Sequence, residues 1–456
     1  MPCHAQNALE IMSMQALHVF HGSDLTNGVD RITLTLVAAL KAQGHAPRAL
    51  VPAEGAVTEA LRNLGIPYQC AAIDCCRGNT AKAELRYLAK ADARRRTLLT
   101  AFAQHRPELM HLNTGHLLDS ALAAAHTGIP VLWHIHSPFE VDFSRYSGFM
   151  SEDAYAWILS SLGSGVVAVS EDIRDSLAAH VPVERLFVVH NGVDEMDLER
   201  RSSLGGDIRR ELGLPAAARL VIGIGRISAQ KDFATFARVA ERLAMTRRDV
   251  YFLIAGPPES RAHAEELARQ ITSSGLEGRI FMLGARLDAP SLLRQSDLFL
   301  STAIFEGHPL TTLEAMALRK PVVAMACVGL RECVTDGVDG LLAPLGDVEG
   351  TAKAVARLLD DSELARHVGK IARQTVEARF SNRVFAAQFM DAAQAILRLG
   401  PPPAQRGAVG VIEGLLAQLA RTEERLRKIE TPRPSFIQRA RNLLRKRASA
   451  PRKSQR

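Results

Sequence analysis

Short apolar runs alternate with longer amphipathic segments along most of this chain, and the alternation comes in two successive series. The runs of the first series that predict strands are 16–20, 48–51, 66–73, 109–112, 131–135, 165–169 and 186–189. The runs of the second series are 219–225, 250–255, 280–283, 298–300 and 322–325. Strands separated by helical segments over this length predict an α/β fold with two doubly wound parallel sheets, one after the other.

Two domains are therefore expected, because 456 residues are too many for one ordinary core. We predict a first domain at 14–195 and a second at 215–384, with a polar, glycine-containing linker at 195–214. One more helix is expected at 385–400, and the remaining segment 401–456 holds an amphipathic helical pattern at 411–429 followed by a basic tail. Open parallel sheets bind ligands at the carboxyl ends of their strands, so a ligand is expected between the domains.

The positive charge of this chain is concentrated near residue 456. The net charge is +7, and 431–456 contains nine Lys or Arg residues and no acidic residue. Without those nine, 47 basic residues face 49 acidic ones, which argues against a protein that binds nucleic acid. Two interpretations of the tail stay open: a disordered, solvated end, or a peripheral contact with an anionic membrane near lipid-linked acceptors.

No segment of the sequence predicts a membrane span or a metal site. No apolar run approaches the ~20 residues that cross a bilayer, and 1–14 lacks the pattern of a secretory signal. The six cysteines show no zinc-like pairing, and no Asp-x-Asp motif occurs. We expect a cytoplasmic protein, peripheral on the inner face of the membrane if the tail binds there, with reduced thiols, no dedicated metal and no resident cofactor.

One segment indicates function most clearly. It runs from Glu306 through Gly307, His308, Pro309, Leu310 and Thr311 to Glu314, between a predicted strand and a predicted helix. Pro309 suits a first helical turn, where its missing N–H costs nothing. The N–H groups after it are unpaired at a helix N-terminus, which attracts phosphate. Glutamates accept hydrogen bonds from hydroxyls, so Glu306 and Glu314 suit a ligand in which a diphosphate joins a sugar to a ribose.

The Glu-x7-Glu pattern, with Ala-Met-Ala at 315–317 and Lys-Pro-Val-Val-Ala at 320–324, resembles a known family signature. It is similar to that of the retaining nucleotide-sugar glycosyltransferases of family 4, also called glycosyl transferases group 1. The resemblance covers roughly residues 14 to 395. It implies the GT-B architecture, in which two Rossmann-like domains face each other across a cleft, the second on the donor side and the first on the acceptor side. It also implies that the last helix crosses back to the first domain.

Two cations follow the first strand of the second series. Arg226 comes directly after Gly225, and Lys231 opens the next helical segment. Both are placed to face a diphosphate, and the resemblance implies that they bind the diphosphate of the donor. Gly223-x-Gly225-x-x-Ser228 is close to a dinucleotide fingerprint, but Ser228 replaces its third glycine and the cations stand where bare backbone should approach a pyrophosphate. A nicotinamide dehydrogenase is therefore disfavoured.

Two positions in the first domain complete the expected site. His134 and His136 lie on one face at the end of a predicted strand. The resemblance implies a histidine there beside the donor sugar and acceptor; His136 fits better, because it is last before the loop, and His134 is the reserve. Asn27-Gly28-Val29 resembles a loop near the donor phosphates that usually reads Gly-Gly, and Asn27 tolerates a positive φ better than most residues.

The expected activity is transfer of a sugar from a nucleoside-diphosphate sugar to a glycan or lipid-linked acceptor. Cleavage develops negative charge on the diphosphate, which Arg226, Lys231 and the helix terminus would stabilise. Glu306 would hold the sugar and Glu314 the ribose, and the resemblance alone implies retention of the anomeric configuration. Two alternatives stay open: a GT-B epimerase that acts on a nucleotide sugar, and a catalytically silent scaffold on the same fold.

Overall fold

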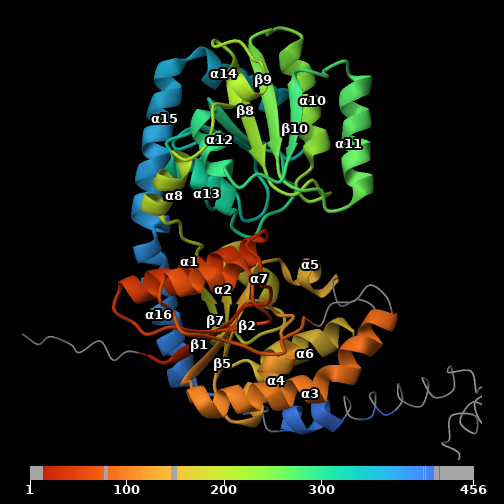
Figure 1. Ribbon diagram of the computed structural model, residues 1–456, viewed down its shortest axis with the longest axis vertical. Helices are drawn as coiled ribbons and strands as arrows, with labels where there is room; N and C mark the ends of the chain where they lie inside the picture. The colour runs from red at the N-terminus through yellow and green to blue at the C-terminus, as the bar shows by residue number, and fades with distance from the viewer. Residues whose placement is uncertain are drawn as a thin grey trace, which may run out of the picture.

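The computed structural model describes residues 14–75, 81–144, 151–403, 405, 407–414, 418 and 421 of the chain. These residues form two α/β lobes, drawn one above the other in Figure 1. The first lobe contains a seven-stranded sheet and the second a six-stranded sheet, and all pairings between their strands are parallel. The predicted fold class is confirmed.

The first lobe is built around strands that are buried on both faces. Its strands are β1 (Ala16–Val19), β2 (Arg48–Val51), β3 (Tyr68–Cys70), β4 (Leu109–Leu112), β5 (Val131–Ile135), β6 (Gly165–Ala168) and β7 (Leu186–Val188). Its helical segments are α1 (Gly28–Ala42), α2 (Ala56–Asn63), α3 (Ala81–His105), α4 (Leu118–His126), α5 (Phe139–Ser144), α6 (Glu152–Leu162), α7 (Glu171–Leu177) and η1 (Val183–Arg185). The strand order is β3-β2-β1-β4-β5-β6-β7. Helices cover both faces of such a sheet, which explains why β6 is apolar throughout and why β4 and β5 are apolar except at His111 and His134.

The second lobe repeats this arrangement. Its strands are β8 (Arg219–Ile224), β9 (Val250–Ala255), β10 (Ile280–Gly284), β11 (Leu298–Ser301), β12 (Val322–Met325) and β13 (Leu341–Ala343). Its helical segments are α8 (Glu195–Ser202), α9 (Ile208–Glu211), α10 (Phe233–Ala244), α11 (Arg261–Ser273), α12 (Ala289–Gln295), α13 (Leu310–Ala317), α14 (Val348–Asp360), α15 (Ser362–Thr375) and η2 (Val376–Phe380). The order β10-β9-β8-β11-β12-β13 reverses direction between β8 and β11, as the first sheet does between β1 and β4. Ligands of open α/β sheets bind outside the carboxyl ends of the strands at such a reversal.

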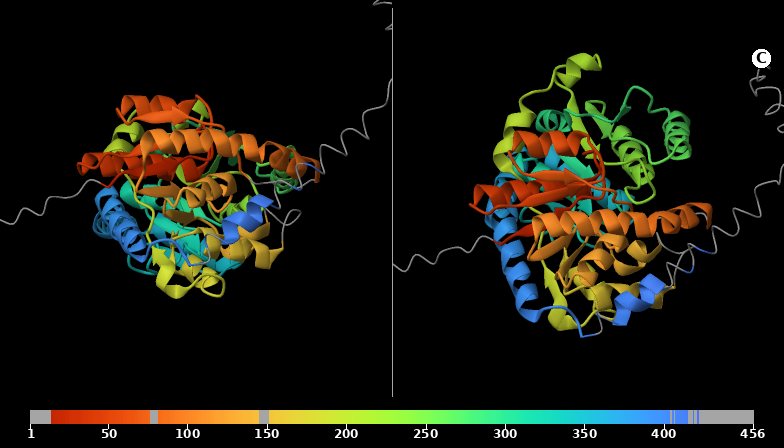
Figure 2. Two further views of the ribbon diagram at one scale, coloured as in Figure 1. Left: turned by 90° about the horizontal axis from the view of Figure 1, so that it is seen from below. Right: turned by 60° about the horizontal axis from the view of Figure 1, so that its bottom comes forward.

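The helix α16 (Asn382–Leu399) returns to the first lobe, as the resemblance implied. It packs against α1, and Phe385, Phe389 and Ile396 are buried in one cluster with Leu36 and other first-lobe side chains. Figures 1 and 2 show α16, in blue, running along the side of the first lobe. This helix is therefore part of the core of the first lobe.

The segment 195–214 is not the plain polar linker that its sequence suggested. It contains α8 and α9, whose first turns are capped by Asp194 and Asp207. Leu198 and Ile208 anchor these helices in the core of the second lobe. One buried apolar residue per short polar helix is too weak a periodic signal for a sequence pattern to show.

The lobes touch through reciprocal capping contacts. The carboxylate of Glu332, in the second lobe, accepts hydrogen bonds from the backbone N–H groups of Glu171 and Asp172 at 2.8 Å each. Asp172, in the first lobe, in turn accepts one from the backbone N–H of Gly329 at 3.0 Å. Each lobe thus supplies a carboxylate to unpaired backbone donors of the other.

The part of the chain after α16 is described only in pieces. Residues 407–414 are helical, whereas most of the predicted helix at 411–429 and the whole basic tail at 431–456 lie outside the described residues. Among the residues that are described, no helix is long and apolar enough to cross a membrane. Cys70, Cys327 and Cys333 are free thiols.

Candidate active site

Loops at the carboxyl ends of the two sheets meet between the lobes. The backbone of Gly307, after β11, lies so close to the loop after β5 that a Cβ on Gly307 would fall 2.2 Å from the carbonyl oxygen of His136. A Cβ on Gly28, at the start of α1, would lie 4.0 Å from Cδ1 of Leu310, at the start of α13. The structure therefore brings predicted residues from both lobes to one interface.

The start of α13 offers free backbone donors at this interface. The helix begins at Leu310, and Pro309 is its N-cap, one position earlier than the first helical turn that we expected. No side chain caps this end, so the N–H groups of Leu310 and Thr311 have no partner within the helix. A helix start of this kind attracts anions in general, and anion binding at this one stays a prediction.

Lys231 and Glu306 form an ion pair beside this terminus. Lys231 Nζ lies 2.5 Å from Glu306 Oε1, and the Glu306 side chain is only 7% exposed. The stem of Lys231 crosses Gly225, where an added Cβ would lie 2.8 Å from Lys231 Cε. Asp232 is the N-cap of α10 and holds this turn with a φ of 45°, so Lys231 lies just before the helix rather than in it. An ammonium has three donors, so Lys231 can bind a second anion while it keeps Glu306.

Arg226 lies at the same strand end but on its exposed side. Its Nη1 atom is 3.7 Å from Oε1 of Glu259, and its side chain is 51% exposed. An exposed, loosely paired guanidinium is held weakly, so Arg226 is free to turn toward a phosphate. The two predicted cations thus differ, since Lys231 is fixed and Arg226 is at the rim.

Glu314 is buried in α13 and not on the solvated face that a surface helix would give it. Its carboxylate pairs with the guanidinium of Arg31, which belongs to α1 of the first lobe. Sequence reasoning missed Arg31, although a cation in the first turn after Asn27-Gly28-Val29 was a usable signal. This ion pair joins the two lobes at the predicted ribose-binding acid.

His136 follows β5 and lies beside a second residue that sequence reasoning missed. Its Nε2 atom is 2.8 Å from Oδ1 of Asn113, and Asn113 Nδ2 donates to the carbonyl oxygen of Val29 at 2.6 Å. A polar residue directly after the buried strand β4 was the available signal. His134, the reserve, is buried inside the sheet, and burial lowers its pKa to about 3.

Asn27 does not adopt the positive φ that its place in the loop suggested. Its φ is −99° and its ψ is 150°, and its side chain caps α1 by accepting from the backbone N–H of Asp30 at 2.8 Å. Asparagine is among the strongest N-cap residues, which explains why it can stand where the family usually has glycine. Gly28 and Val29 are consequently the first two residues of α1, and the starts of α1 and α13 lie near each other.

His308 is placed behind the loop, where it packs against other rings. It is 3% exposed, and its ring lies 4.8 Å from that of His190 and 5.0 Å from that of Phe380, measured between centroids. Burial, with smaller contributions from His190 and Arg379, lowers its pKa well below the ordinary value. Its carbonyl oxygen accepts from Asn191 Nδ2 at 2.8 Å. The neutral ring of His308 therefore supports the loop from the inside.

A buried thiol, Cys327, lies near Glu306. Burial, with a smaller contribution from Glu306, raises the pKa of Cys327 to about 12, so this thiol stays neutral and is a poor nucleophile. Within the described ranges, no group of three or more His, Cys, Asp or Glu residues could hold a metal ion.

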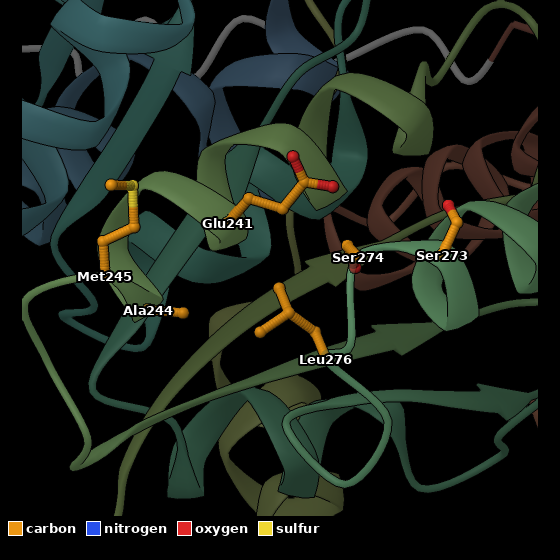
Figure 3. A pocket seen from close by; sticks show the side chains of 6 residues that line it. All are labelled: Glu241, Ala244, Met245, Ser273, Ser274 and Leu276. Atoms are coloured by element: carbon orange, nitrogen blue, oxygen red, sulfur yellow. The ribbon is translucent and has the colours of Figure 1, made fainter.

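A surface pocket lies at the ends of α10 and α11. It is lined by Glu241, Ala244, Met245, Ser273, Ser274 and Leu276, and none of the predicted site residues is among them (Figure 3).

Two parallel-sheet lobes whose carboxyl ends face each other define the GT-B class of protein. Two family profiles agree: residues 26–196 match Glycosyltransferase Family 4, and residues 206–375 match Glycosyl transferases group 1. Together these matches include both lobes, and the chain belongs to the group 1 glycosyltransferases.

Known relatives are similar over part of their length. An α-D-kanosaminyltransferase of Streptomyces kanamyceticus is 28% identical over 268 residues, which make up 56% of this chain and 67% of that protein. A UDP-Gal:α-D-GlcNAc-diphosphoundecaprenol α-1,3-galactosyltransferase of Escherichia coli is 25% identical over 250 residues, 53% of this chain and 64% of that protein. The matched region thus spans about two thirds of either relative.

Solved structures show the same fold. The crystal structure of Anabaena HepE in complex with UDP and glucose has a TM-score of 0.68 and 22% sequence identity, and covers 84% of this chain and 99% of that one. The superposition confirms the GT-B architecture. Identity at this level supports the fold alone.

Proposed function

We propose that this protein transfers a sugar from a nucleoside-diphosphate sugar to a glycan or lipid-linked acceptor, with retention of the anomeric configuration. The observation that carries the proposal is the Lys231–Glu306 pair, 2.5 Å apart, beside the uncapped start of α13. It combines a fixed cation for phosphate with a buried acceptor for sugar hydroxyls. The family to which the chain belongs supports the same activity.

In this proposal the diphosphate of the donor binds at the start of α13. Lys231 and the N–H groups of Leu310 and Thr311 stabilise the negative charge that grows on the leaving diphosphate. Arg226 turns from the rim to bind a phosphate oxygen with its planar fork. Preorganised donors of this kind take over the task of a metal, so no resident metal or cofactor is required.

The rings of the donor lie on either side of the diphosphate. Glu306 accepts hydrogen bonds from hydroxyls of the transferred sugar, and Glu314 accepts them from the ribose, with Arg31 holding its other oxygen. His136 lies next to the sugar and the acceptor. The acceptor attacks from the side of the leaving group while a phosphate oxygen assists its deprotonation, which gives retention.

Names of related proteins support the donor and acceptor classes. Anabaena HepE is described in complexes with UDP and glucose and with UDP-glucose. The E. coli relative is named for a galactosyl transfer to a lipid diphosphate acceptor. We therefore favour a uridine diphosphate sugar for this chain, and an acceptor that is a glycan or is linked to a lipid.

A panel of nucleotide sugars tests the proposal. UDP-glucose, UDP-galactose, UDP-N-acetylglucosamine, GDP-mannose and ADP-glucose are each added during thermal unfolding. A true donor at about 100 times its Kd should stabilise the native state by about 2.7 kcal/mol, or roughly 5–10 °C in Tm. NMR of the product anomeric proton then reports retention or inversion. If none of these compounds raises Tm and none is consumed, the proposal is wrong.

The same panel distinguishes a transferase from an epimerase. A transferase releases free nucleotide faster when acceptor is present, whereas an epimerase converts one nucleotide sugar into another with no acceptor. A scaffold would bind without turnover. The intact Lys231–Glu306 and Arg31–Glu314 pairs favour the transferase over the scaffold.

A further inference from the structure

We infer that Asn113 is a positioning residue for His136: it fixes the imidazole as the Nε2–H tautomer and ties it to the first turn of α1. The inference deepens the proposed function, because it rests on the role of His136 beside the sugar. It starts from two hydrogen bonds made by one buried amide group.

The first bond determines how the amide of Asn113 is oriented. The carbonyl oxygen of Val29 can only accept, and it lies 2.6 Å from Nδ2 of Asn113. The NH2 group must therefore face Val29, and the amide oxygen must face the opposite way. Asn113 is fully buried, and turning its amide over would bring the amide oxygen against the carbonyl oxygen of Val29, two acceptors with no proton between them.

The second bond determines the tautomer of His136. Its Nε2 atom lies 2.8 Å from the amide oxygen of Asn113. That oxygen can only accept, so Nε2 must carry a proton. A neutral imidazole has one N–H, and its lone pair is then on Nδ1. In this state the Nδ1 atom of His136 can accept a hydrogen bond and cannot donate one.

The ring of His136 is also supported by a row of buried histidines. Its centroid lies 4.4 Å from that of His134, at an angle of 34°. His134 Nδ1 is 3.1 Å from His111 Nε2, and His111 Nδ1 is 2.8 Å from His18 Nδ1. Burial lowers the pKa of His18 and of His134 to about 3 and that of His111 well below its usual range. The ring of His136 therefore packs against the end of a row of uncharged, buried histidines.

The bond to Val29 connects this geometry to the predicted donor site. Val29 is the second residue of α1, whose start lies next to the start of α13. Its carbonyl oxygen also accepts from Thr33 Oγ1 at 3.0 Å, inside α1. Asn113 thus links the ends of β4 and β5 to the helix start that faces the second lobe.

Nitrogen NMR of 15N-histidine-labelled protein measures the tautomer directly and needs no substrate. The signal of His136 is identified by its loss in His136→Gln. We expect a protonated Nε2 in the wild type and in Asn113→Asp, because a carboxylate also accepts from Nε2–H. Asn113→Leu should lose this preference. Thr33→Val removes the other donor to Val29 and is the matched control, with an unchanged tautomer.

Turnover of the donor found in the panel gives the second readout. Misplacement of a group at the reacting centre costs on the order of 10²-fold, so kcat of Asn113→Leu should fall by about that factor while Thr33→Val stays near wild type. A proton on Nδ1 of His136 in the wild type, or an unchanged tautomer in Asn113→Leu, overturns the inference, and the wild-type spectrum decides even if a variant does not fold. If the tautomers behave as expected but no donor is used, only the proposed function fails.

Discussion

Lys231 is the single side chain on which the proposed chemistry depends most. It is held by the buried Glu306 and lies beside the start of α13. In the proposed function its charge is therefore preorganised for the leaving diphosphate. Loss of one such preorganised donor typically costs about 10²–10³-fold in kcat. We predict a fall of that order for Lys231→Ala, measured as release of nucleotide from the donor found in the panel.

A cation far from the interface gives the control for this prediction. Arg242 of α10 is 55% exposed and makes only a 3.5 Å contact with Glu349. Arg242→Ala should therefore turn over at nearly the wild-type rate, since exposed ion pairs contribute little. Near-normal kcat for Lys231→Ala, with the fold intact by circular dichroism, would contradict the assigned role.

The burial of His18 predicts that the free energy of unfolding depends on pH. Burial lowers its pKa to about 3 in the folded state, whereas an unfolded histidine titrates near 6.5. Above about pH 6.5 neither state holds the proton, and stability is complete. As pH falls from 6.5 toward 3, only the unfolded state takes the proton up, so the free energy of unfolding falls by up to about 1.4 kcal/mol per pH unit for this histidine.

Urea unfolding at several pH values between 7 and 5 tests this expectation. His18→Gln removes one such titration, so its stability should fall less steeply with acid than that of the wild type. The exposed His367 of α15 is a matched control, and His367→Gln should keep the wild-type slope. Identical slopes for His18→Gln and the wild type would show that the buried row does not resist protonation.

The loop between β11 and α13 approaches the loop after β5 more closely than any side chain would allow. A Cβ at Gly307 would lie 2.2 Å from the His136 carbonyl oxygen and 3.3 Å from Cγ2 of Val169. Gly307→Ala should therefore keep the lobes apart and lower turnover by on the order of 10²-fold, because a displacement of about 1 Å at the reacting centre costs that much.

Gly206→Ala is the control for the effect of replacing a glycine by alanine. An added Cβ at Gly206 meets nothing within 4 Å. Small-angle X-ray scattering should show a larger radius of gyration for Gly307→Ala and no change for Gly206→Ala. Both variants should retain the wild-type circular dichroism spectrum. If Gly307→Ala scatters and turns over like the wild type, the close approach of the two loops is not required.

The path of α16 joins the two lobes into one molecule. The helix follows the second lobe in sequence, yet Phe389 is fully buried in the first lobe, with its ring 4.9 Å from that of His111. Truncation of a buried phenylalanine costs about 3–5 kcal/mol. We predict that Phe389→Ala lowers the free energy of unfolding of the first lobe by that amount.

Tryptophan fluorescence reads this effect selectively. Both tryptophans of the chain, Trp133 and Trp157, are in the first lobe. Their urea transition should move to lower denaturant in Phe389→Ala, whereas Leu399→Ala, at the 40% exposed end of the same helix, should leave it nearly unchanged. A fluorescence transition that Phe389→Ala does not move would mean that α16 does not stabilise the first lobe.

Most strands could be predicted from sequence, because a strand buried on both faces must be apolar along its whole length. The runs at β6, β9 and β12 are examples. The short strand β13 and the helices α8 and α9 could not be predicted, since each is only a few residues long or contributes one or two apolar residues to the core.

The candidate site divides in the same way. Glu306, Glu314, Lys231 and His136 could be named from sequence because each belongs to a local pattern at a strand end or a helix start. Arg31 and Asn113 could not, since their partners lie far along the chain: Arg31 pairs with Glu314, and Asn113 lies between His136 and Val29. Contacts at such separations leave no local periodicity in sequence.

The amino-acid sequence by itself determined the two α/β lobes, the helix start that follows Pro309 and the family, because strand burial and helix starts depend on neighbouring residues. Only the tertiary structure decided which groups form ion pairs and hydrogen bonds and which are buried. It pairs Lys231 with Glu306, seals His308 behind its loop, and sets the ring of His136 between Asn113 and a neutral histidine row. Burial and pairing are properties of distances through space, and no pattern along one chain contains them.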